Sequence, residues 1–233
     1  MNQKGRFQLD KKTIAGMIDH AVLKPEATDM DLERECSIAV KYGVASVCVK
    51  PSHVVMAKKL LASSGVAVST VIGFPHGSTT TGCKVAEALE ALENGAVELD
   101  MVINIGRLLS GDMDFVREDI KSVVEAAHKR GALLKVIIET SLLSDEMKAY
   151  ACRLSEEAGA DFVKTSTGFN GGGAALADIV IMKNSVSPKV RLKASGGIKS
   201  FQQAVEFAEA GCSRLGTSST EAILQGGTSN STY

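Results

Sequence analysis

The stretch Gly159-Ala-Asp-Phe-Val-Lys-Thr-Ser-Thr-Gly168 contains a joint between a helix and a strand, and this kind of joint recurs along the chain. Gly159 closes a helix-like segment, where a glycine with positive φ is expected. A short apolar run follows, typical of a buried strand, and it ends at Lys164 before a turn of Ser, Thr and Gly. The same joint, a glycine followed by a small or apolar residue and a β-rich run, recurs at five positions: Gly43, Gly65, Gly95, Gly131 and Gly211.

The repeated joint predicts alternating strands and helices. The expected strands are Met17–Leu23, Ala45–Val49, Ala67–Ile72, Ala96–Ile103, Leu133–Glu139, Asp161–Lys164, Val190–Lys193 and Ser213–Gly216. The expected helices are Thr28–Tyr42, Thr80–Asn94, Asp112–Arg130, Ser144–Ala158 and a short segment, Thr220–Leu224. Thr28 and Asp31 are spaced as a capping box, which marks a helix start.

Eight strand–helix units predict an α/β fold, a single (β/α)8 TIM barrel with a short N-terminal helix at Leu9–Met17 that closes the barrel bottom. The alternative is an open doubly wound sheet, which usually has fewer strands. We expect a catalytic barrel domain over residues 1–225 and a flexible C-terminal tail over residues 226–233, where Gly226-Gly227 interrupts the chain and no apolar anchor follows.

The composition of the chain limits which partners and cofactors are expected. The chain of 233 residues has a formal net charge of −1, so no broad basic surface is expected and nucleic acid is not a predicted partner. No apolar run approaches the length of a membrane span, and the first residues lack the apolar core of a signal peptide. Five scattered cysteines and four histidines have no metal-ligand spacing, which predicts reduced thiols, a cytoplasmic location, and neither a metal nor a cofactor.

Two lysines stand where parallel strands present residues to a ligand. Lys164 ends one strand-like run, and Lys193 ends another in Val190-Arg-Leu-Lys-Ala-Ser-Gly-Gly197. A buried ammonium needs solvation or a partner, so a lone lysine would indicate a structural role. Two such lysines, each beside a glycine turn able to bind phosphate, indicate amine chemistry on a phosphorylated substrate.

Acidic side chains are expected to accompany these lysines inside the barrel. Side chains alternate along a strand, so Glu98 and Asp100 share one face of their strand, and Lys135 lies opposite the apolar face of its own strand. A purely structural ion network remains the alternative for Lys135 and Glu98. Asp19, at the end of the first strand, is a weaker candidate for proton transfer, and Cys48 is interpreted as a core thiol.

Glycine turns late in the chain are the candidates for phosphate binding. They are Gly168 with Gly171–Gly173, Gly196-Gly197, and Gly216-Thr-Ser-Ser219 before a helix-like segment. Backbone N–H groups at such turns bind anions without formal charge, and barrel enzymes often place a phosphate after strands seven and eight. His76, in Gly73-Phe-Pro-His-Gly77, is more simply explained as part of a tight turn than as a site residue.

Several distinctive motifs are spread over nearly the whole chain: Phe162-Val-Lys-Thr-Ser-Thr-Gly168, Lys193-x-Ser-Gly-Gly-Ile198, Ile18-Asp-His20, Val71-Ile-Gly-Phe-Pro-His-Gly77, Glu98-Leu-Asp100, Leu134-Lys-Val-Ile-Ile-Glu-Thr140 and Gly216-Thr-Ser-Ser219. In this combination they resemble the deoxyribose-phosphate aldolase family. The resemblance implies a metal-free class I aldolase that reversibly cleaves 2-deoxy-D-ribose 5-phosphate to D-glyceraldehyde 3-phosphate and acetaldehyde. A homodimer is also implied.

The resemblance also assigns roles to residues. It implies that Lys164 forms the Schiff base, that Lys193 is its partner lysine, and that Asp100 relays protons. The phosphate would be held by these residues: Gly168, Gly196, Gly197, Ser218 and Ser219. Some family members have a basic residue after the glycine of the Schiff-base motif, where this chain has Phe169, so backbone amides and Lys199 are expected to take a larger share in phosphate binding.

The chemistry fits the residues independently of the resemblance. Only a neutral amine attacks a carbonyl, whereas a free lysine with a pKa of about 10.4 is almost entirely protonated at pH 7. Burial and a cationic Lys193 nearby are both expected to lower the pKa of Lys164. The resulting iminium is an electron sink for cleavage of a carbon–carbon bond.

Three other interpretations remain open: another lysine aldolase or a transaldolase, a metal-dependent sugar-phosphate epimerase, and a binding module in which the lysines are inert members of ion pairs. The tail also has two interpretations. It is expected to emerge at the barrel bottom as a solvated end, unless a short last helix lets Tyr233 fold over the site and assist proton transfer.

Overall fold

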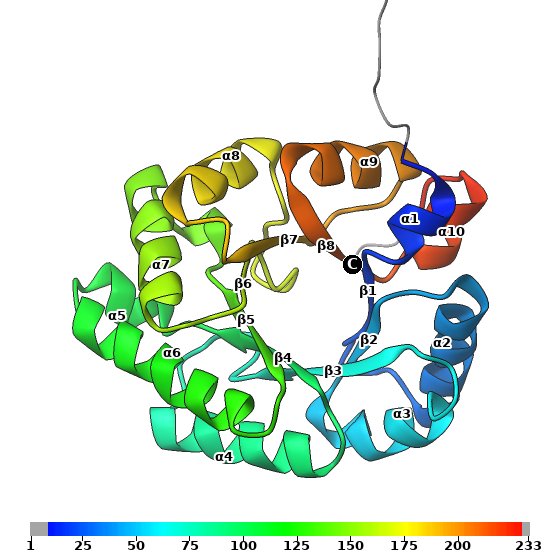
Figure 1. Ribbon diagram of the computed structural model, residues 1–233, viewed down its shortest axis with the longest axis horizontal. Coiled ribbons are helices and arrows are strands. Elements are labelled where there is room, and N and C mark those ends of the chain that lie inside the picture. Colours follow the sequence, from blue (N-terminus) through cyan, green and yellow to red (C-terminus); the bar gives the residue numbers. More distant parts are fainter. Residues whose placement is uncertain (1–8, 230–233) are drawn as a thin grey trace, which may run out of the picture.

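A computed structural model describes residues 9–229, which form a closed barrel of parallel strands joined in sequence order from β1 to β8 (Figure 1). The strands are β1 (Ile18–Val22), β2 (Ser46–Val49), β3 (Ala67–Ile72), β4 (Glu98–Val102), β5 (Leu133–Ile137), β6 (Phe162–Lys164), β7 (Arg191–Ser195) and β8 (Cys212–Thr217). The predicted (β/α)8 TIM barrel is confirmed, and the open sheet is wrong because β8 pairs with β1.

Helices surround the barrel (Figure 1). They are α1 (Lys11–Ala15), α2 (Asp29–Tyr42), α3 (Val54–Leu60), α4 (Thr81–Glu93), α5 (Ile105–Leu109), α6 (Met113–His128), α7 (Asp145–Glu157), α8 (Leu176–Ser185), α9 (Phe201–Ala210) and α10 (Thr220–Gln225), with 3-10 turns at Pro51–His53 and Thr140–Leu142. No helix within residues 9–229 is long and apolar enough to cross a membrane. The expected N-terminal helix is present, but α1 lies beside α10 at the edge of the ring and does not close the barrel bottom (Figure 1).

Local sequence signals explain where the elements begin and end. Thr28 and Asp31 form the predicted capping box, in which each side chain accepts a hydrogen bond from the other residue's backbone N–H. Gly43 then ends α2 with φ of 63°, a conformation that costs a residue with a Cβ atom more than it costs glycine. The other five glycines of the repeated joint also have positive φ: Gly65, Gly95, Gly131, Gly159 and Gly211.

Strand alternation divides the residues of β5 between two environments. Leu134 and Val136 are fully buried and belong to the apolar core between strands and helices. Lys135, between them in sequence, is also fully buried, but it lies on the other face, where its ammonium group contacts carboxylates inside the barrel. Hence the barrel has an apolar outer layer and a charged interior.

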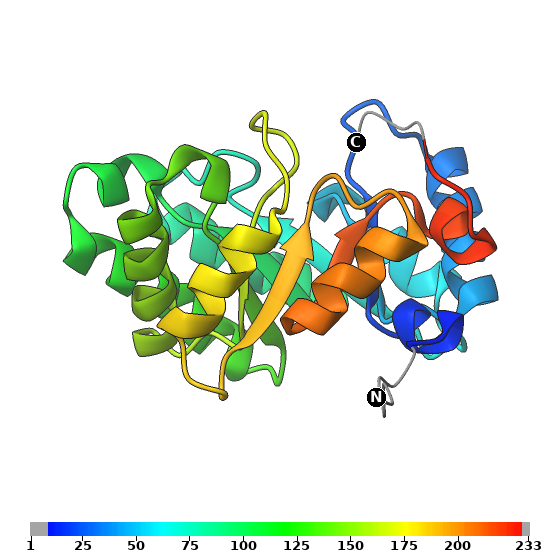
Figure 2. The same ribbon diagram turned by 90° about the horizontal axis from the view of Figure 1, so that it is seen from above.

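The beginning of the C-terminal tail corrects one expectation. Thr228 forms an antiparallel bridge with Ser200, and the Ser229 N–H donates to the Lys199 carbonyl oxygen at 3.0 Å. Lys199 and Ser200 follow β7, so this part of the tail lies at the carboxyl ends of the strands and not at the barrel bottom (Figure 2). The reason is that α10 has only six residues, too few to carry the chain back along the barrel. Tyr233 lies outside the described residues.

Candidate active site

Asp100 is the centre of the charged interior. Its Oδ2 atom lies 2.8 Å from the Lys164 Nζ and 2.7 Å from the Lys193 Nζ, and its Oδ1 atom lies 2.9 Å from the Lys135 Nζ. All four side chains are almost fully buried. One carboxylate therefore contacts three lysine nitrogens in a buried region, where ionic contacts are much stronger than at a surface.

Strand register brings these groups together. Lys164 on β6 is the Cα partner of Lys193 on β7, and Lys135 on β5 is the Cα partner of Asp100 on β4. Gly216 on β8 leaves space for two side chains, because a Cβ atom at this position would overlap the Ser195 hydroxyl and lie 3.2 Å from the Lys193 Cε. A side chain on β8 would therefore crowd both Ser195 and the second lysine.

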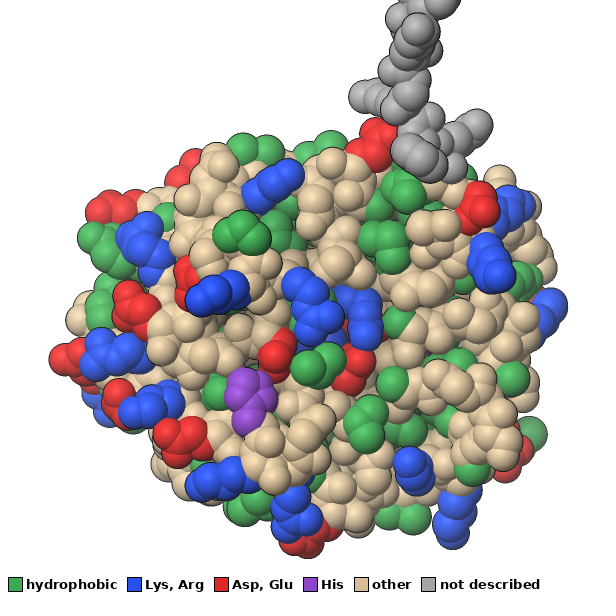
Figure 3. Space-filling view, viewed as in Figure 1, with side chains coloured by type: hydrophobic (Ala, Val, Ile, Leu, Met, Phe, Trp, Pro, Cys, Tyr) green, Lys and Arg blue, Asp and Glu red, His purple; other side chains and the backbone are tan. Residues whose placement is uncertain are grey.

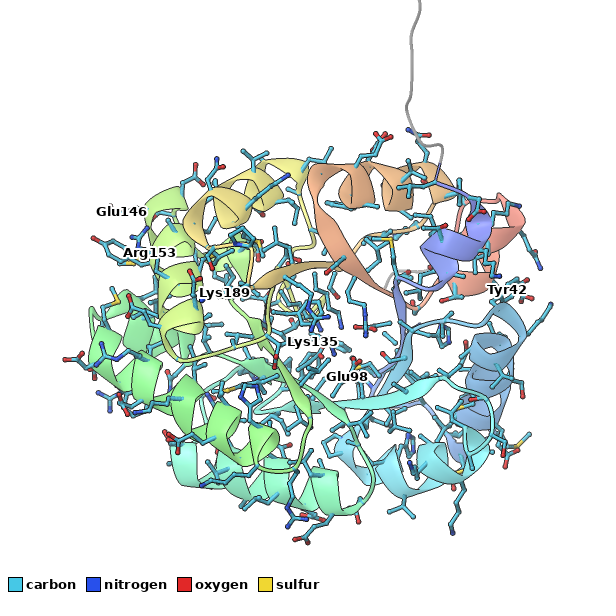
Figure 4. All side chains as sticks on the ribbon, in the orientation of Figure 1. Tyr42, Glu98, Lys135, Glu146, Arg153 and Lys189 are labelled. Carbon is cyan, nitrogen blue, oxygen red and sulfur yellow. The ribbon has the colours of Figure 1, made fainter. Side chains whose placement is uncertain are left out.

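A second layer of ion pairs lies toward the amino ends of the strands. Asp19 accepts from the Lys193 Nζ at 2.6 Å and from the Ser46 hydroxyl at 2.7 Å, and it also pairs with Arg214. Glu98 lies 2.7 Å from the Lys135 Nζ and 2.7 Å from an Arg214 nitrogen. Figure 4 shows Lys135 and Glu98 inside the ring of strands. The acid–lysine cluster predicted from strand alternation is present.

These contacts shift the pKa values of Lys164 and Lys193 in opposite directions. Burial is the largest effect on Lys164, and together with the charge of Lys193 it lowers the pKa of Lys164 despite the attraction of Asp100. Burial alone would also lower the pKa of Lys193, but Asp100 and Asp19 outweigh it and raise this pKa. Burial opposes the charge of Asp100, yet Lys135, Lys164 and Lys193 hold its pKa well below the usual range. Lys164 is therefore the amine suited to act as a nucleophile.

A cavity of about 320 Å³ opens at the carboxyl ends of β6, β7 and β8. Its lining is rich in glycine and small polar residues: Ala21, Gly168, Gly171, Gly172, Gly173, Ser195, Gly196, Gly197, Ile198, Lys199, Gly216, Thr217 and Ser218. The backbone approaches itself closely here, because a Cβ atom on Gly173 would lie 2.6 Å from the Gly196 carbonyl oxygen. Such a cavity suits a small anion that binds backbone N–H groups.

Most of the predicted phosphate residues meet in this cavity. The glycines Gly168, Gly196 and Gly197 line it together with Ser218 and Lys199. Ser219 is buried behind this lining, and its backbone N–H donates to the Thr217 hydroxyl at 3.0 Å. Among residues 9–229, no group of three or more His, Cys, Asp or Glu side chains is arranged to hold a metal ion.

A small apolar cluster, here called the apolar wall, lies near the carboxyl ends of β1, β2 and β3. Leu23, Cys48 and Val71 form a small buried cluster that packs against Phe74 and Phe169, whose rings meet edge to face with centroids 5.2 Å apart. Burial raises the pKa of the Cys48 thiol to about 11, as expected for the core thiol that the sequence predicts. Phe169 faces this wall, so the position after Gly168 contributes an apolar contact.

Two residues of the site were not predicted. Arg214 completes the ion cluster, and its position opposite Leu215 in the alternation of β8 was the available signal. Glu139 was expected at the end of a strand, but β5 ends at Ile137 and Glu139 has φ of 54°, the only positive value of a non-glycine residue in the described part of the chain. Its buried carboxylate accepts hydrogen bonds from Thr167 and from the Asn170 side chain.

Comparison with known proteins identifies the family. The model of the DeoC/LacD family aldolases matches residues 13–226. The chain belongs to this aldolase family. Deoxyribose-phosphate aldolase of Clostridium perfringens is 51% identical over 225 residues, which cover 97% of this chain and 100% of the relative. The enzyme of the same name from Thermococcus gammatolerans is 53% identical over 215 residues, covering 91% and 96% of the two chains.

A solved structure of the family confirms the fold. The deoxyribose phosphate aldolase of Aeropyrum pernix, described as a tetramer, has a TM-score of 0.87 and 34% identity to this chain and covers 93% of it and 91% of its own length. The resemblance predicted from the lysine and glycine motifs is therefore confirmed, and so is the prediction that the protein is an aldolase.

Proposed function

We propose that the protein cleaves 2-deoxy-D-ribose 5-phosphate reversibly into D-glyceraldehyde 3-phosphate and acetaldehyde, with Lys164 as the Schiff-base residue. The observation that carries this assignment is the pair of buried lysines on one carboxylate, with the pKa of Lys164 lowered and that of Lys193 raised. The family and its relatives of that name support the substrate.

In the forward reaction the neutral amine of Lys164 attacks C1 of the open-chain sugar, and loss of water gives the iminium. The C3 hydroxyl then loses its proton, the C2–C3 bond breaks, and its electron pair enters the enamine on Lys164 while C3 becomes the aldehyde of glyceraldehyde 3-phosphate. Protonation at C2 and hydrolysis release acetaldehyde and restore the amine. Each step is balanced in atoms and protons without a cofactor.

Asp100 and Lys193 support these steps in different ways. The Asp100 carboxylate contacts the Nζ atoms of both Lys164 and Lys193, so it is placed to relay protons through a water molecule at the carbinolamine and enamine stages. Lys193 is held protonated by two carboxylates, and its charge favours the neutral form of Lys164. Lys135 and Asp19 keep these two groups in place, and we assign them no direct chemical step.

The glycine-lined cavity is our candidate for the phosphate site. Its lining contains Gly168, Gly196, Gly197 and Ser218, and Lys199 is its one lysine. Ser219 supports the turn from behind through its contact with Thr217. Gly216 lines the cavity and also borders the Lys193 side chain, so the proposed phosphate site adjoins the lysine cluster.

We also propose a cytoplasmic location, a homodimer, and a division into a catalytic domain at residues 1–225 and a tail at residues 226–233. The free thiols at Cys36, Cys48, Cys83, Cys152 and Cys212 support a reducing compartment. Light scattering of the purified protein tests the dimer, since the relative from Aeropyrum pernix is described as a tetramer.

The function is tested by trapping the covalent intermediate. Incubation with acetaldehyde and borohydride should add one ethyl group at Lys164, which peptide mass spectrometry locates. Lys189, exposed at the surface and labelled in Figure 4, is the matched control and should stay unmodified. Modification of Lys135 or Lys193 with Lys164 untouched would overturn the assignment, and a substrate panel comparing acetaldehyde with dihydroxyacetone donors would separate this activity from that of other lysine aldolases.

A further inference from the structure

The ion cluster extends beyond the residues assigned to chemistry. Arg214 on β8 and Glu98 on β4 lie nearer the amino ends of their strands, with side chains 15% and 6% exposed. Two hydrogen bonds join them, at 2.7 and 2.9 Å. Figure 3 shows basic and acidic side chains side by side over the centre of one face of the barrel. Neither residue contacts the glycine-lined cavity.

Arg214 competes with the lysines for the inner carboxylates Asp19 and Glu98. It pairs with Asp19 through one oxygen, while the other Asp19 oxygen lies 2.6 Å from the Lys193 Nζ. Glu98 accepts from Arg214 with both oxygens, and its Oε2 atom also lies 2.7 Å from the Lys135 Nζ. The positive charge of Arg214 therefore weakens the attraction of Asp19 and Glu98 for Lys193 and Lys135. These two lysines then depend more on Asp100, and the attraction of Asp100 for Lys164 is weakened in turn.

The charges of the cluster balance only when Lys164 is neutral. Its cations are Lys135, Lys164, Lys193 and Arg214, and its carboxylates are Asp19, Glu98 and Asp100. Three carboxylates offset three of the four cations, and Lys164 is the one cation whose pKa is lowered, whereas those of Lys135, Lys193 and Arg214 are raised. An excess charge in a buried cluster is unfavourable, so Lys164 is the member of the cluster that loses its proton most readily.

Other groups that face the cluster do not change this balance. Ser46 on β2 and Ser69 on β3 are uncharged, and the Cys48 thiol stays protonated because burial raises its pKa to about 11. From β7, Arg191 lies over the Phe162 ring of β6 at 4.0 Å, but it is exposed and solvent screens its charge.

We propose that Arg214 and Glu98 are positioning residues that set the protonation state of Lys164 from the opposite end of the barrel. The inference rests on the proposed function of Lys164 as the Schiff-base residue. It predicts opposite effects from the two partners of one ion pair. Loss of the Arg214 charge leaves more negative charge for the lysines and keeps Lys164 protonated to higher pH, whereas loss of the Glu98 charge releases the Lys164 proton at lower pH.

The test measures kcat/KM against pH for Arg214→Met, Glu98→Gln and the double variant. The acidic limb of the profile should move to higher pH in Arg214→Met and to lower pH in Glu98→Gln, each by about one pH unit, the size expected for one unit charge in a partly buried cluster. The double variant restores the charge balance, so its limb should return close to that of the parent protein. Arg130→Met removes an arginine from the exposed pair with Glu93 and should leave the limb unmoved.

A second measurement separates this inference from the proposed function. The rate of borohydride trapping with acetaldehyde, followed at Lys164 by peptide mass against pH, reports the neutral amine directly and should shift as the profiles do. Trapping at another lysine would contradict the proposed function of Lys164. Trapping at Lys164 with limbs that stay in place, or that move in the same direction in both single variants, would overturn only the role of Arg214 and Glu98. If Arg214→Met does not fold, the test uses Glu98→Gln and the charge-conserving Arg214→Lys. The acidic limb of Arg214→Lys should stay where it is in the parent protein.

Discussion

The Glu139 carboxylate accepts a hydrogen bond from the Thr167 hydroxyl at 2.5 Å and another from the Thr167 backbone N–H at 3.2 Å. It also accepts from the Asn170 amide at 2.8 Å, and Asn170 in turn donates to the Pro75 carbonyl oxygen at 3.1 Å. One buried carboxylate thus joins the loops after β3, β5 and β6. The turn that leads from Lys164 to Gly168 is held by a residue in a strained conformation, which persists only where its surroundings enforce it.

Glu139→Gln should weaken this turn. The amide offers one acceptor oxygen in place of two, so one donor of Thr167 or Asn170 is left facing another donor, at a cost of about 1–3 kcal/mol in unfolding free energy. We expect a higher KM for the phosphorylated substrate and a lower melting temperature. Glu146→Gln, on an exposed residue of α7 (Figure 4), is the control and should change neither. Unchanged kinetics and melting in Glu139→Gln would show that the turn is held without it.

Lys193→Leu should move the activity profile to higher pH. Lys193 lowers the pKa of Lys164 by its charge, so its removal raises that pKa, and each unit of increase lowers the neutral fraction about tenfold at a pH below it. The acidic limb of kcat/KM against pH is the measurement. A variant with reduced activity and an unmoved limb would mean that Lys193 binds substrate and does not tune Lys164.

Asp100→Asn should remove both activity and stability. Lys135, Lys164 and Lys193 would lose the carboxylate that they share, and an unbalanced buried charge costs about 3–5 kcal/mol in unfolding free energy. Urea denaturation is the measurement. A variant as stable as the parent protein would mean that Asp19 and Glu98 are sufficient to compensate the three lysines.

The same carboxylates predict how stability depends on acid. The pKa values of Asp19 and Asp100 in the folded protein lie below the ordinary value of 3.8. Their contribution is therefore present above that pH and is lost as the pH falls from there toward the folded-state values. Denaturation at a series of pH values should show a loss of stability below pH 3.8 that is smaller in Asp100→Asn than in the parent protein.

Ser218→Glu should act on the phosphate alone. Ser218 lines the glycine-rich cavity, where a carboxylate would repel a phosphate group. Cleavage of 2-deoxyribose 5-phosphate should lose much more of its kcat/KM than cleavage of free 2-deoxyribose. Equal losses on the two substrates would remove Ser218 from the phosphate site.

Gly216→Ala should disturb Lys193 directly. The added methyl group would overlap the Ser195 hydroxyl and would lie 3.2 Å from the Lys193 Cε, so Ser195 must turn away and Lys193 must shift by a few tenths of an ångström relative to Asp100 and Asp19. We expect a loss of activity of about tenfold or more, comparable with other small displacements of catalytic groups. Gly82→Ala, in α4 and with no atom within 4 Å of the added group, is the control and should keep full activity. Full activity in Gly216→Ala would show that Lys193 tolerates the displacement.

Much of the fold could be predicted because each junction between a helix and a strand is determined by residues close to it in sequence. A glycine with positive φ and a capped helix start depend on neighbours within a few residues, and Gly43 and Thr28 behave as their sequence context predicts. The alternation around Lys135 could be predicted for the same reason. The meeting of Asp100, Lys164 and Lys193 followed from knowing which ends of the strands gather in a barrel.

The unpredicted features depend on distant parts of the chain. Arg214 enters the cluster because β8 pairs with β1 and places it beside Asp19, a residue from the other end of the chain. Glu139 leaves the strand conformation because Thr167 and Asn170, on another loop, bind its carboxylate. The position of Thr228 follows from the shortness of α10, which helix propensity alone does not fix.

The strands that carry the charges have a consequence for assembly of the barrel. All three carboxylates of the cluster come from β1 and β4, and all four cations come from β5 to β8. A fragment ending after β4 would place acids in its interior without a cation, and the remaining fragment would gather only cations. Neither half of the chain can neutralise its own interior, so the two halves are stable only as one cooperative unit.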